Sequence, residues 1–289
     1  DTTTNAGAYD RTDTTSVFTV TEEDVSNRTT FDVKYYYANV SITKEVLQVL
    51  NVGPEAVFRQ VDIRLVNGAL TMSENLSLDL YNHGQDKSGD SGTDRLLNLN
   101  GLDEIVNDGT TDGWQTHTYA NYGTIIRSDV SGALNSVPKN VNANITYKVM
   151  DEEYMKAVIG SKWPTLGVTT NLGFSYIKQK FQPQQRITTV DPTIGFVGLE
   201  FNKARIMVSQ YCPGTATKTP NTDSGGETLW FLSPEDFRLW ITADPEFAFG
   251  FSGFKGNRDD NLLAGQLFFA GNISCVSPRT QKLLYNITG

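Results

Sequence analysis

The sequence contains few of the residues from which most metal and catalytic sites are built. Its 289 residues include two cysteines and two histidines. Cys212 and Cys275 are far apart and follow no metal-ligand spacing, so we expect two buried free thiols, since no pattern supports a disulfide between them. His83 and His117 have no carboxylate or cysteine beside them at ligand spacing. The sequence therefore predicts no metal site and no cofactor.

Long apolar runs and an excess of positive charge are also missing. The longest apolar run, around residues 262–270, is interrupted by Gly265 and Gln266 and is far shorter than the ~20 residues of a membrane span. With 33 acidic and 24 basic residues, the net charge is −9. A dedicated nucleic-acid binder would carry a basic patch or stripe. We therefore expect no membrane insertion, and only weak contact with a polyanion through local lysines and arginines.

The motifs of common enzyme classes are absent in their required contexts. No G-x-S-x-G, H-E-x-x-H, P-loop or dinucleotide-binding glycine motif is found where its structure would demand it. The segment GFSGFKGN at 250–257 follows a predicted strand without a helix after it, which is typical of a turn. Asp151, Glu152 and Glu153 lie in a predicted helix, where the helix dipole explains them. We predict that the chain is not an enzyme and assign no catalytic residue.

Residues 53–84 stand out as a single very long helix. They begin with a proline and a glutamate, which suit a first helical turn. Apolar residues then recur at steps of three and four: Phe58, Val61, Leu65, Ala69, Met72, Leu76 and Leu80. A second partial stripe comprises Ile63, Val66 and Leu70, which predicts a helix covered on two sides. Gly84 is the predicted left-handed stop, and the helix would be roughly 45 Å long.

A β-hairpin is predicted before this helix. Residues 1–15 are polar, rich in threonine and without an apolar period, which indicates an extended arm. Two runs rich in β-branched and aromatic residues follow, at 16–21 and 31–42, with an acidic turn after the first. The hairpin has little neighbouring helix to pack on, so we expect it to project and to need a partner surface. Deleting residues 16–42 should then leave the long helix and its domain folded.

The remainder of the chain indicates a mixed α+β fold. Helices are predicted at 102–106, 146–159 and 173–181. Strands are predicted at 166–169, 196–201, 204–208, 228–232, 237–242, 262–270, 272–276 and 281–287. Neither an internal repeat nor a low-complexity tract is present. A polar arm and a hairpin on such a fold suit a protein that functions in an assembly.

The order of several segments carries a resemblance to a known family. YYYANVSI leads through GPEAV into the helix that ends LSLDLYNHG, and GLDEIVND and YGTIIRSDV follow. PTLGVTTNLGFSYI is a strand-then-helix unit, and GFVGLEFNKARIMVSQYCPG contains paired strands. TLWFLSPEDFRLWI and AGQLFFAGNISCVSPRTQKLLYNI complete the series. In this order and spacing, over residues 30–289, the chain resembles a tailed-bacteriophage major capsid protein of the Hong Kong 97-type fold.

The resemblance implies an α+β fold with the parts of a phage major capsid protein. These parts are the N-terminal arm 1–15, the extended loop 16–50 with its β-hairpin, the peripheral domain 51–99 with the spine helix 53–84, the axial domain 100–236, and the C-terminal strands of the peripheral domain 237–289. In this family the extended loop lies across a neighbouring subunit. The axial domain meets its copies at five-fold and six-fold centres.

The same resemblance implies a function and a set of partners. The chain would be a major capsid protein that self-assembles, through pentamers and hexamers, into an icosahedral shell around packaged double-stranded DNA. Scaffolding, portal and decoration proteins are the further partners, and contact with DNA would be weak and non-specific. The protein would belong to the virion and be assembled in the host bacterial cytoplasm. Some members crosslink subunits through lysine and asparagine, but no pair in this sequence can be assigned that role.

Two other classes of function stay open at this point. A secreted or cell-surface β-rich binding module is favoured if the N-x-S/T sequons carry sugar, or if Cys212 bonds Cys275. The sequons begin at Asn27, Asn39, Asn75, Asn144, Asn272 and Asn286. A hydrolase with an acidic pair is favoured if two carboxylates converge in a pocket and have raised pKa values.

Overall fold

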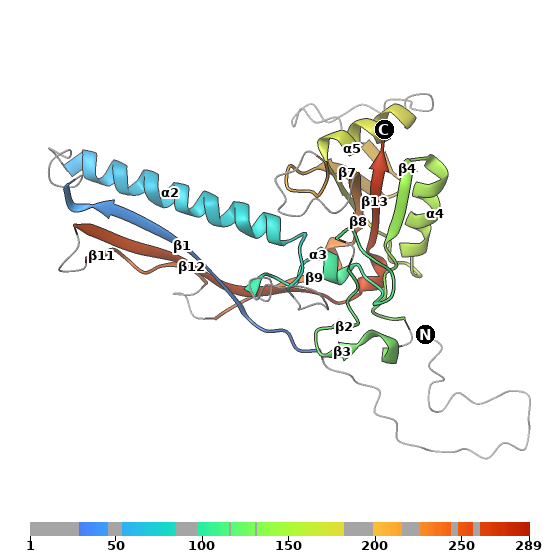
Figure 1. Cartoon of the computed structure of the whole chain (residues 1–289), viewed down its shortest axis with the longest axis horizontal. Helices are drawn as coiled ribbons and strands as arrows, with labels where there is room; N and C mark the ends of the chain where they lie inside the picture. Colours follow the sequence, from blue (N-terminus) through green and yellow to red (C-terminus); the bar gives the residue numbers. More distant parts are fainter. Residues whose placement is uncertain are drawn as a thin grey trace, which may run out of the picture.

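A computed structural model describes most of the chain and divides it into an elongated arm and an α/β body (Figure 1). It describes residues 29–45, 54–84, 97–115, 117–130, 132–181, 199–215, 226–243, 248–256 and 261–289. The predicted N-terminal arm 1–15 and the first strand of the predicted hairpin lie outside these residues. The long helix and the longest strand lie side by side in the arm, and the remaining helices lie in or beside the body.

The long helix of the arm is α2 (Pro54–Asp79), of 26 residues and roughly 39 Å. Pro54 is its first residue, as predicted, since the missing N–H costs nothing there. The helix ends five residues before Gly84, because the next residues form tighter turns, in which the N–H of Tyr81 donates to Leu78 at 3.1 Å. The predicted extension to residue 84 is therefore wrong.

Gly84 is needed for a close approach and does not act as a left-handed stop. It is absent from the residues with positive φ. A Cβ at this position would lie 2.5 Å from the carbonyl oxygen of Asn98 and 3.0 Å from the nitrogen of Asn100. The chain that returns after α2 thus passes directly over Gly84. The sequence pattern predicts a helix stop at Gly84, but the glycine is needed there because the returning chain leaves no room for a side chain. The spacing of residues along the sequence does not reveal this contact.

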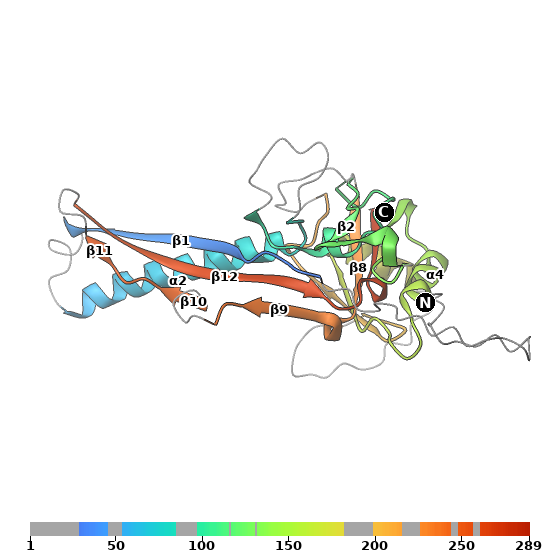
Figure 2. The same cartoon turned by 90° about the horizontal axis from the view of Figure 1, so that it is seen from below.

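Two long antiparallel strands run beside α2. β1 (Lys34–Thr43) pairs with β12 (Leu262–Cys275) along its whole length, with Lys34 opposite Gly271 and Thr43 opposite Leu262. The predicted break between strands 262–270 and 272–276 is wrong, because Gly271 pairs on both sides and continues one strand. Figure 1 shows this ribbon beneath the helix, and in Figure 2, seen from below, the strands lie across the helix.

β1 corrects the expectation of a projecting hairpin over residues 16–42. Val40 is buried against α2, and Tyr36 packs beside Phe269 at a ring-centroid distance of 6.1 Å. A Cβ at Gly68 would lie 2.9 Å from a methyl carbon of Val40, so this glycine lets the helix approach the ribbon closely. The second half of the predicted hairpin is thus an integral strand of the arm, with both a paired strand and a packing helix.

The other edge of β12 carries three short strands in succession. They are β9 (Phe237–Ile241), β10 (Ala248–Phe251) and β11 (Lys255–Gly256), all antiparallel to β12. The arm is therefore a three-strand-wide ribbon with α2 over one of its faces.

The body is built on a six-stranded mixed sheet. Its order is β4 (Lys139–Asn144), β13 (Lys282–Thr288), β8 (Glu227–Leu232), β5 (Leu166–Thr169), β7 (Ala204–Val208) and β6 (Leu199–Phe201). β13 therefore lies in the body, so the expectation that all strands of 237–289 complete the sheet of the long helix is wrong for β13. The predictions of β5 and β7 match their observed bounds.

Both faces of this sheet are covered. On one face, α4 (Tyr147–Ala157) and α5 (Asn171–Phe181) contribute Met150, Tyr154 and Ile177 to a core with alternate strand residues. The other face packs under the residues that follow α2, Leu80 and Tyr81, and under α3 (Leu102–Ile105). Every residue of β8 is consequently buried. Two short strands, β2 (Asn121–Tyr122) and β3 (Ile125–Ile126), lie beside the junction with the arm.

Candidate assembly surfaces

Two strands pass from the body sheet to the arm sheet at one junction. β8 continues through the 3-10 turn η3 (Pro234–Asp236) into β9. β12 continues through the 3-10 turn η4 (Pro278–Thr280) into β13. A serine precedes each turn, Ser233 in the first case and Ser277 in the second. Since proline fixes φ near −65°, the same Ser-Pro start redirects both strands.

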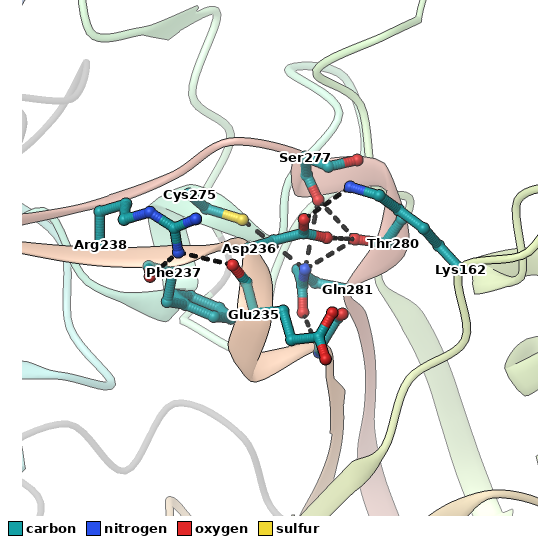
Figure 3. Close-up of polar contacts among 10 residues, drawn as sticks. Lys162, Glu235, Asp236, Phe237, Arg238, Cys275, Ser277, Thr280 and Gln281 are labelled. Carbon is teal, nitrogen blue, oxygen red and sulfur yellow. Dashed lines mark hydrogen bonds and ion pairs between the residues drawn. The ribbon is translucent and has the colours of Figure 1, made fainter.

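The carboxylate of Asp236 connects the two turns (Figure 3). One of its oxygens accepts a hydrogen bond from Lys162 Nζ at 2.8 Å, and the other accepts one from the Thr280 hydroxyl at 2.7 Å. The backbone carbonyl of Asp236 accepts the N–H of Val276, also at 2.8 Å. Asp236 and Thr280 are both buried. A buried carboxylate is stable only with such compensation, so this contact locks the two turns together.

The side-chain amide of Gln281 makes the second connection at the junction. Its Oε1 accepts the backbone N–H of Ser233 at 2.7 Å. Its Nε2 donates to the Thr280 hydroxyl at 2.8 Å and to the carbonyl of Ser277 at 3.2 Å. Figure 3 shows the amide between the two turns. Because Gln281 is fully buried and its amide bonds on both sides, the turns are held at a fixed mutual position.

The residues before β1 are tied to the same junction. The Thr29 hydroxyl donates to the carbonyl of Tyr122 at 3.1 Å, and the ring of Phe31 packs edge-on against that of Tyr122 at 5.2 Å. The Tyr122 hydroxyl accepts the N–H of Cys275 at 2.7 Å and donates to its carbonyl at 2.9 Å. Tyr122 therefore joins the entry of β1 to the end of β12.

The outer face of α2 is an exposed apolar stripe. Ile63, Val66 and Leu70 expose 50%, 57% and 62% of their surface. The predicted cover on a second side of the helix is not found among the described residues of this chain, because β1 and β12 occupy a single side. Three large aliphatic side chains on one solvent-facing stripe indicate a surface that is completed by another molecule.

The face of the arm ribbon that points away from α2 is also apolar. Tyr35 and Tyr37 of β1 are 68% and 66% exposed, since they alternate with residues that pack under the helix. Trp240 of β9 is 63% exposed and donates from Nε1 to the Ser274 hydroxyl at 2.8 Å. These three aromatic side chains provide large contact areas of the kind common at protein interfaces.

A groove of about 490 Å³ opens between α2 and the strands β9, β10 and β12. The helix contributes Met72 and Leu76 to its wall, and the strands contribute Leu239, Phe249 and Ile273. Leu239 and Phe249 are more than half exposed. The helix thus covers the β1 side of the ribbon and leaves the β9 and β10 side open. With the helix stripe and the aromatic face, this groove is one of three candidate assembly surfaces on the arm.

Three solved structures match the fold of this chain over most of its length. The holo-SrpI encapsulin complex from Synechococcus elongatus matches with a TM-score of 0.57 and 11% identity, covering 88% of this chain and 74% of that chain. The satellite phage P4 procapsid matches with a TM-score of 0.51 and 10% identity, covering 97% and 79%. The capsid of an empty GTA particle gives 0.50 and 7%, covering 93% and 81%.

The chain has the Hong Kong 97-type capsid fold. No protein-family model matches the sequence. No curated protein matches it either. Because these identities are 11% or lower, the likeness lies in the arrangement of elements, and the sequence resemblance over residues 30–289 is confirmed at the level of the fold.

The two cysteines of this capsid fold are buried free thiols, as predicted. Burial raises the pKa of Cys212 to about 12 and that of Cys275 to about 12. Both thiols are therefore protonated and unreactive at neutral pH. The condition under which a secreted module would be favoured, a bond between them, is not met. One sequon residue, Asn272, is buried and bonds Asn100 and the carbonyl of Asp32 through its amide.

The two histidines come together although the sequence separates them. The rings of His83 and His117 are 5.9 Å apart, and His83 Nδ1 lies 3.9 Å from a carboxylate oxygen of Asp103. Asp103 also accepts a hydrogen bond from the Tyr119 hydroxyl at 2.7 Å. Within the described residues, no group of three or more potential ligands could hold a metal ion. The cluster packs the segment after α2 against the loop that follows α3.

Two carboxylates with shifted pKa values, Glu153 and Asp79, have structural roles. Glu153 accepts hydrogen bonds from Lys156 at 2.7 Å and from Lys282 at 2.8 Å. Burial raises the pKa of Asp79, but its carboxylate bonds the hydroxyl of Tyr36 and so fixes β1 to the end of α2. The GFSGFKGN segment forms β10, a turn and β11. Across the described ranges, no helix is long and apolar enough to cross a membrane.

Sequence reasoning missed the junction residues Asp236, Thr280 and Gln281. The available signal was the pair of Ser-Pro dipeptides at 233 and 277, each of which favours the start of a turn. Nothing in the local pattern indicates that the two turns meet, because 44 residues separate Asp236 from Thr280.

Proposed function

We propose that this protein is the major capsid protein of a tailed phage, and that its copies assemble into an icosahedral shell around double-stranded DNA. The observation that carries the proposal is the arm with its three apolar surfaces, which no described residue covers, on a Hong Kong 97-type fold. A monomer would leave these surfaces in water, where they favour association. Shell formation buries them repeatedly through contacts that close into rings.

The parts of the subunit take roles that follow from this proposal. We assign residues 1–15 and 16–28 to contacts with neighbouring copies, and the arm with α2 to the peripheral domain. Residues 100–236 together with β13 form the axial domain in this scheme, since β13 lies in the body sheet. Copies would form pentamers and hexamers, with scaffolding, portal and decoration proteins as further partners. The shell would be assembled in the host bacterial cytoplasm and persist in the virion.

The test is negative-stain electron microscopy of the purified protein together with size-exclusion chromatography. Uniform hollow particles, or rings of five and six, are the expected result. Co-expression with the neighbouring genes of its source supplies a scaffolding protein where one is required. A clean monomer near 32 kDa under both conditions would contradict the proposal.

The nucleic-acid content of the particles separates two kinds of shell. Both an encapsulin complex and a phage procapsid are similar to this chain in fold. The proposed phage shell contains nuclease-protected double-stranded DNA after assembly in its host. Particles from that source that never contain protected DNA would favour an encapsulin-like shell, which is the second candidate function.

A further inference from the structure

A basic pocket lies at the edge of the body sheet, and its wall includes residues of β4, α4 and the turn η4. Its volume is about 730 Å³. Its wall contains four cations, Lys139, Lys156, Arg279 and Lys282, and one carboxylate, Glu153. The pocket is thus strongly positive on a chain whose net charge is −9. β4 is the edge strand of the sheet, so the pocket opens to solvent.

The cations outnumber the acidic partners available to them. Glu153 is shared by Lys156, at 2.7 Å, and Lys282, at 2.8 Å. Among the described residues, Lys139 and Arg279 have neither an ion pair nor a side-chain hydrogen bond. Three positive charges in the pocket are therefore uncompensated. Clustered like charges repel, and they persist most easily where an anion compensates them.

Buried polar groups also face the pocket. Lys282 is buried and donates to Glu153 and to the carbonyl of Val137, at 2.6 Å, which uses two of the three hydrogens of its ammonium group. Asn135, on the same wall, has a buried Oδ1 without a hydrogen-bond partner among the described residues. Rotation of this amide would bring its NH2 group to the same place as a donor. An unpaired buried polar atom calls for a partner, which a bound ligand or an ordered water supplies.

We infer that the basic pocket binds a phosphate group through Lys139, Lys156, Arg279 and Lys282. A phosphate carries more than one negative charge when free and presents several acceptor oxygens, so it suits a site with three uncompensated cations better than a single carboxylate does. The planar guanidinium of Arg279 matches two phosphate oxygens at once, and lysines bind phosphate as point charges. The phosphate comes either from free inorganic phosphate or from the backbone of a nucleic acid.

The electrostatics of the pocket agree with this geometry. Burial lowers the pKa of Lys282, and repulsion from Lys156 and Lys139 lowers it further, against the opposite effect of Glu153. A bound phosphate would remove part of that repulsion. If the pocket binds free phosphate, the inference does not depend on the proposed capsid function. If it binds the phosphate backbone of DNA, the inference rests on that proposed function. On an acidic shell protein, such pockets would confine contact with DNA to a few points per subunit.

The test compares two double variants of the full chain. Lys139→Gln with Lys156→Gln removes two pocket cations, both on exposed side chains. Lys148→Gln with Lys178→Gln removes two exposed helical lysines outside the pocket, one of them paired with Glu152 at 3.7 Å. Thermal melts with inorganic phosphate, against chloride at equal ionic strength, measure the first source. Fluorescence anisotropy with a labelled random-sequence DNA duplex over a salt series measures the second.

Phosphate is expected to raise the melting temperature of the wild type and of the control variant, and to leave that of the pocket variant unchanged. If DNA is the source, duplex affinity falls in the pocket variant and the log–log salt slope decreases by about two, while the control keeps both. Stabilisation by phosphate without selective loss of duplex binding would assign the pocket to free phosphate. Equal effects in the two variants, or no response of the wild type to either probe, would overturn the inference.

Microscopy of the same variants keeps this inference separate from the shell proposal. A pocket variant that loses phosphate binding and still forms particles supports the pocket and leaves the shell proposal intact. A wild type that binds phosphate but never assembles supports the pocket and contradicts the shell.

Discussion

At the scale of single residues, the junction between arm and body depends on one buried amide. Gln281→Ala removes the acceptor of the Ser233 N–H and the donor to Thr280. Because each buried group left unpaired costs about 1–3 kcal/mol, we expect a loss of about 2–4 kcal/mol in unfolding free energy. Urea denaturation measures it. Gln179→Ala, on the exposed surface of α5, is the matched control and should change stability by less than about 0.5 kcal/mol.

The carboxylate of Glu153 should make the unfolding free energy of the protein depend on pH. Burial alone would raise its pKa, but hydrogen bonds from Lys156 and Lys282 outweigh burial and lower it below 4.5. A carboxylate whose folded pKa is lowered stabilises the fold above its unfolded pKa, and this contribution disappears as the pH falls through the folded value. Glu153→Gln should therefore melt lower than wild type at pH 7.

The same comparison in acid completes this prediction. The difference in melting temperature between Glu153→Gln and wild type should shrink as the pH is lowered through the folded-state pKa of Glu153, which lies below its ordinary value, because the wild-type carboxylate becomes protonated there. Glu152→Gln, an exposed neighbour on α4, is the control at both pH values. A difference that stays constant over this range would show that Glu153 acts through packing and not through charge.

At the scale of elements, α2 has two faces with different roles. Met72 is buried on the inner face beside Leu99 and Phe269, so Met72→Ala should cost about 2–5 kcal/mol. Leu70 is 62% exposed on the outer stripe, and Leu70→Ala should change stability by less than about 0.5 kcal/mol. Thermal melts of the two variants check both values. Equal costs would mean that the outer stripe is covered within the chain.

The strand β1 changes the expected outcome of a deletion. Removing residues 16–42 was expected to leave the helix and its domain folded, because those residues were assigned to a projecting hairpin. In the structure the deletion removes β1 from beside β12 and exposes the inner face of α2. We now expect loss of the arm, with amide hydrogens of β12 exchanging rapidly in a deuterium-exchange experiment. Protection of β12 equal to that in the wild type would contradict this.

At the scale of the whole molecule, the outer stripe of α2 should matter for assembly and not for folding. Val66→Asp places a charge on a side chain that is 57% exposed, so the monomer keeps its melting temperature. Burial of that charge between subunits would cost several kcal/mol, and particles should be lost or misshapen. Particle counts by microscopy measure the effect. Asp62→Asn, on an exposed neighbouring position, is the control and should assemble normally.

The sequence predicted well those features that depend on neighbours along the chain. The strands at 166–169 and 204–208 follow from short apolar runs between turns, and α2 follows from its periodicity. The position of β1 did not follow, because it is paired with residues more than 200 positions away. The basic pocket was missed for the same reason, since Lys139, Lys156 and Arg279 come from three separate elements. Periodicity indicates which face is apolar, but not whether the same chain covers it.

The double crossing at the junction also has a mechanical consequence. The arm and the body share two continuous strands, through η3 and η4, and Asp236 and Gln281 fasten these side by side. Two side-by-side connections that are linked to each other allow the arm to bend relative to the body about one axis. They resist rotation of the arm about its own length. A subunit built this way would adapt to differences in shell curvature by tilting its arm, while the rotational setting of the arm stays constant. Loss of the Asp236 and Gln281 contacts would first allow the arm to rotate about its length relative to the body, while the arm and the body both stay folded.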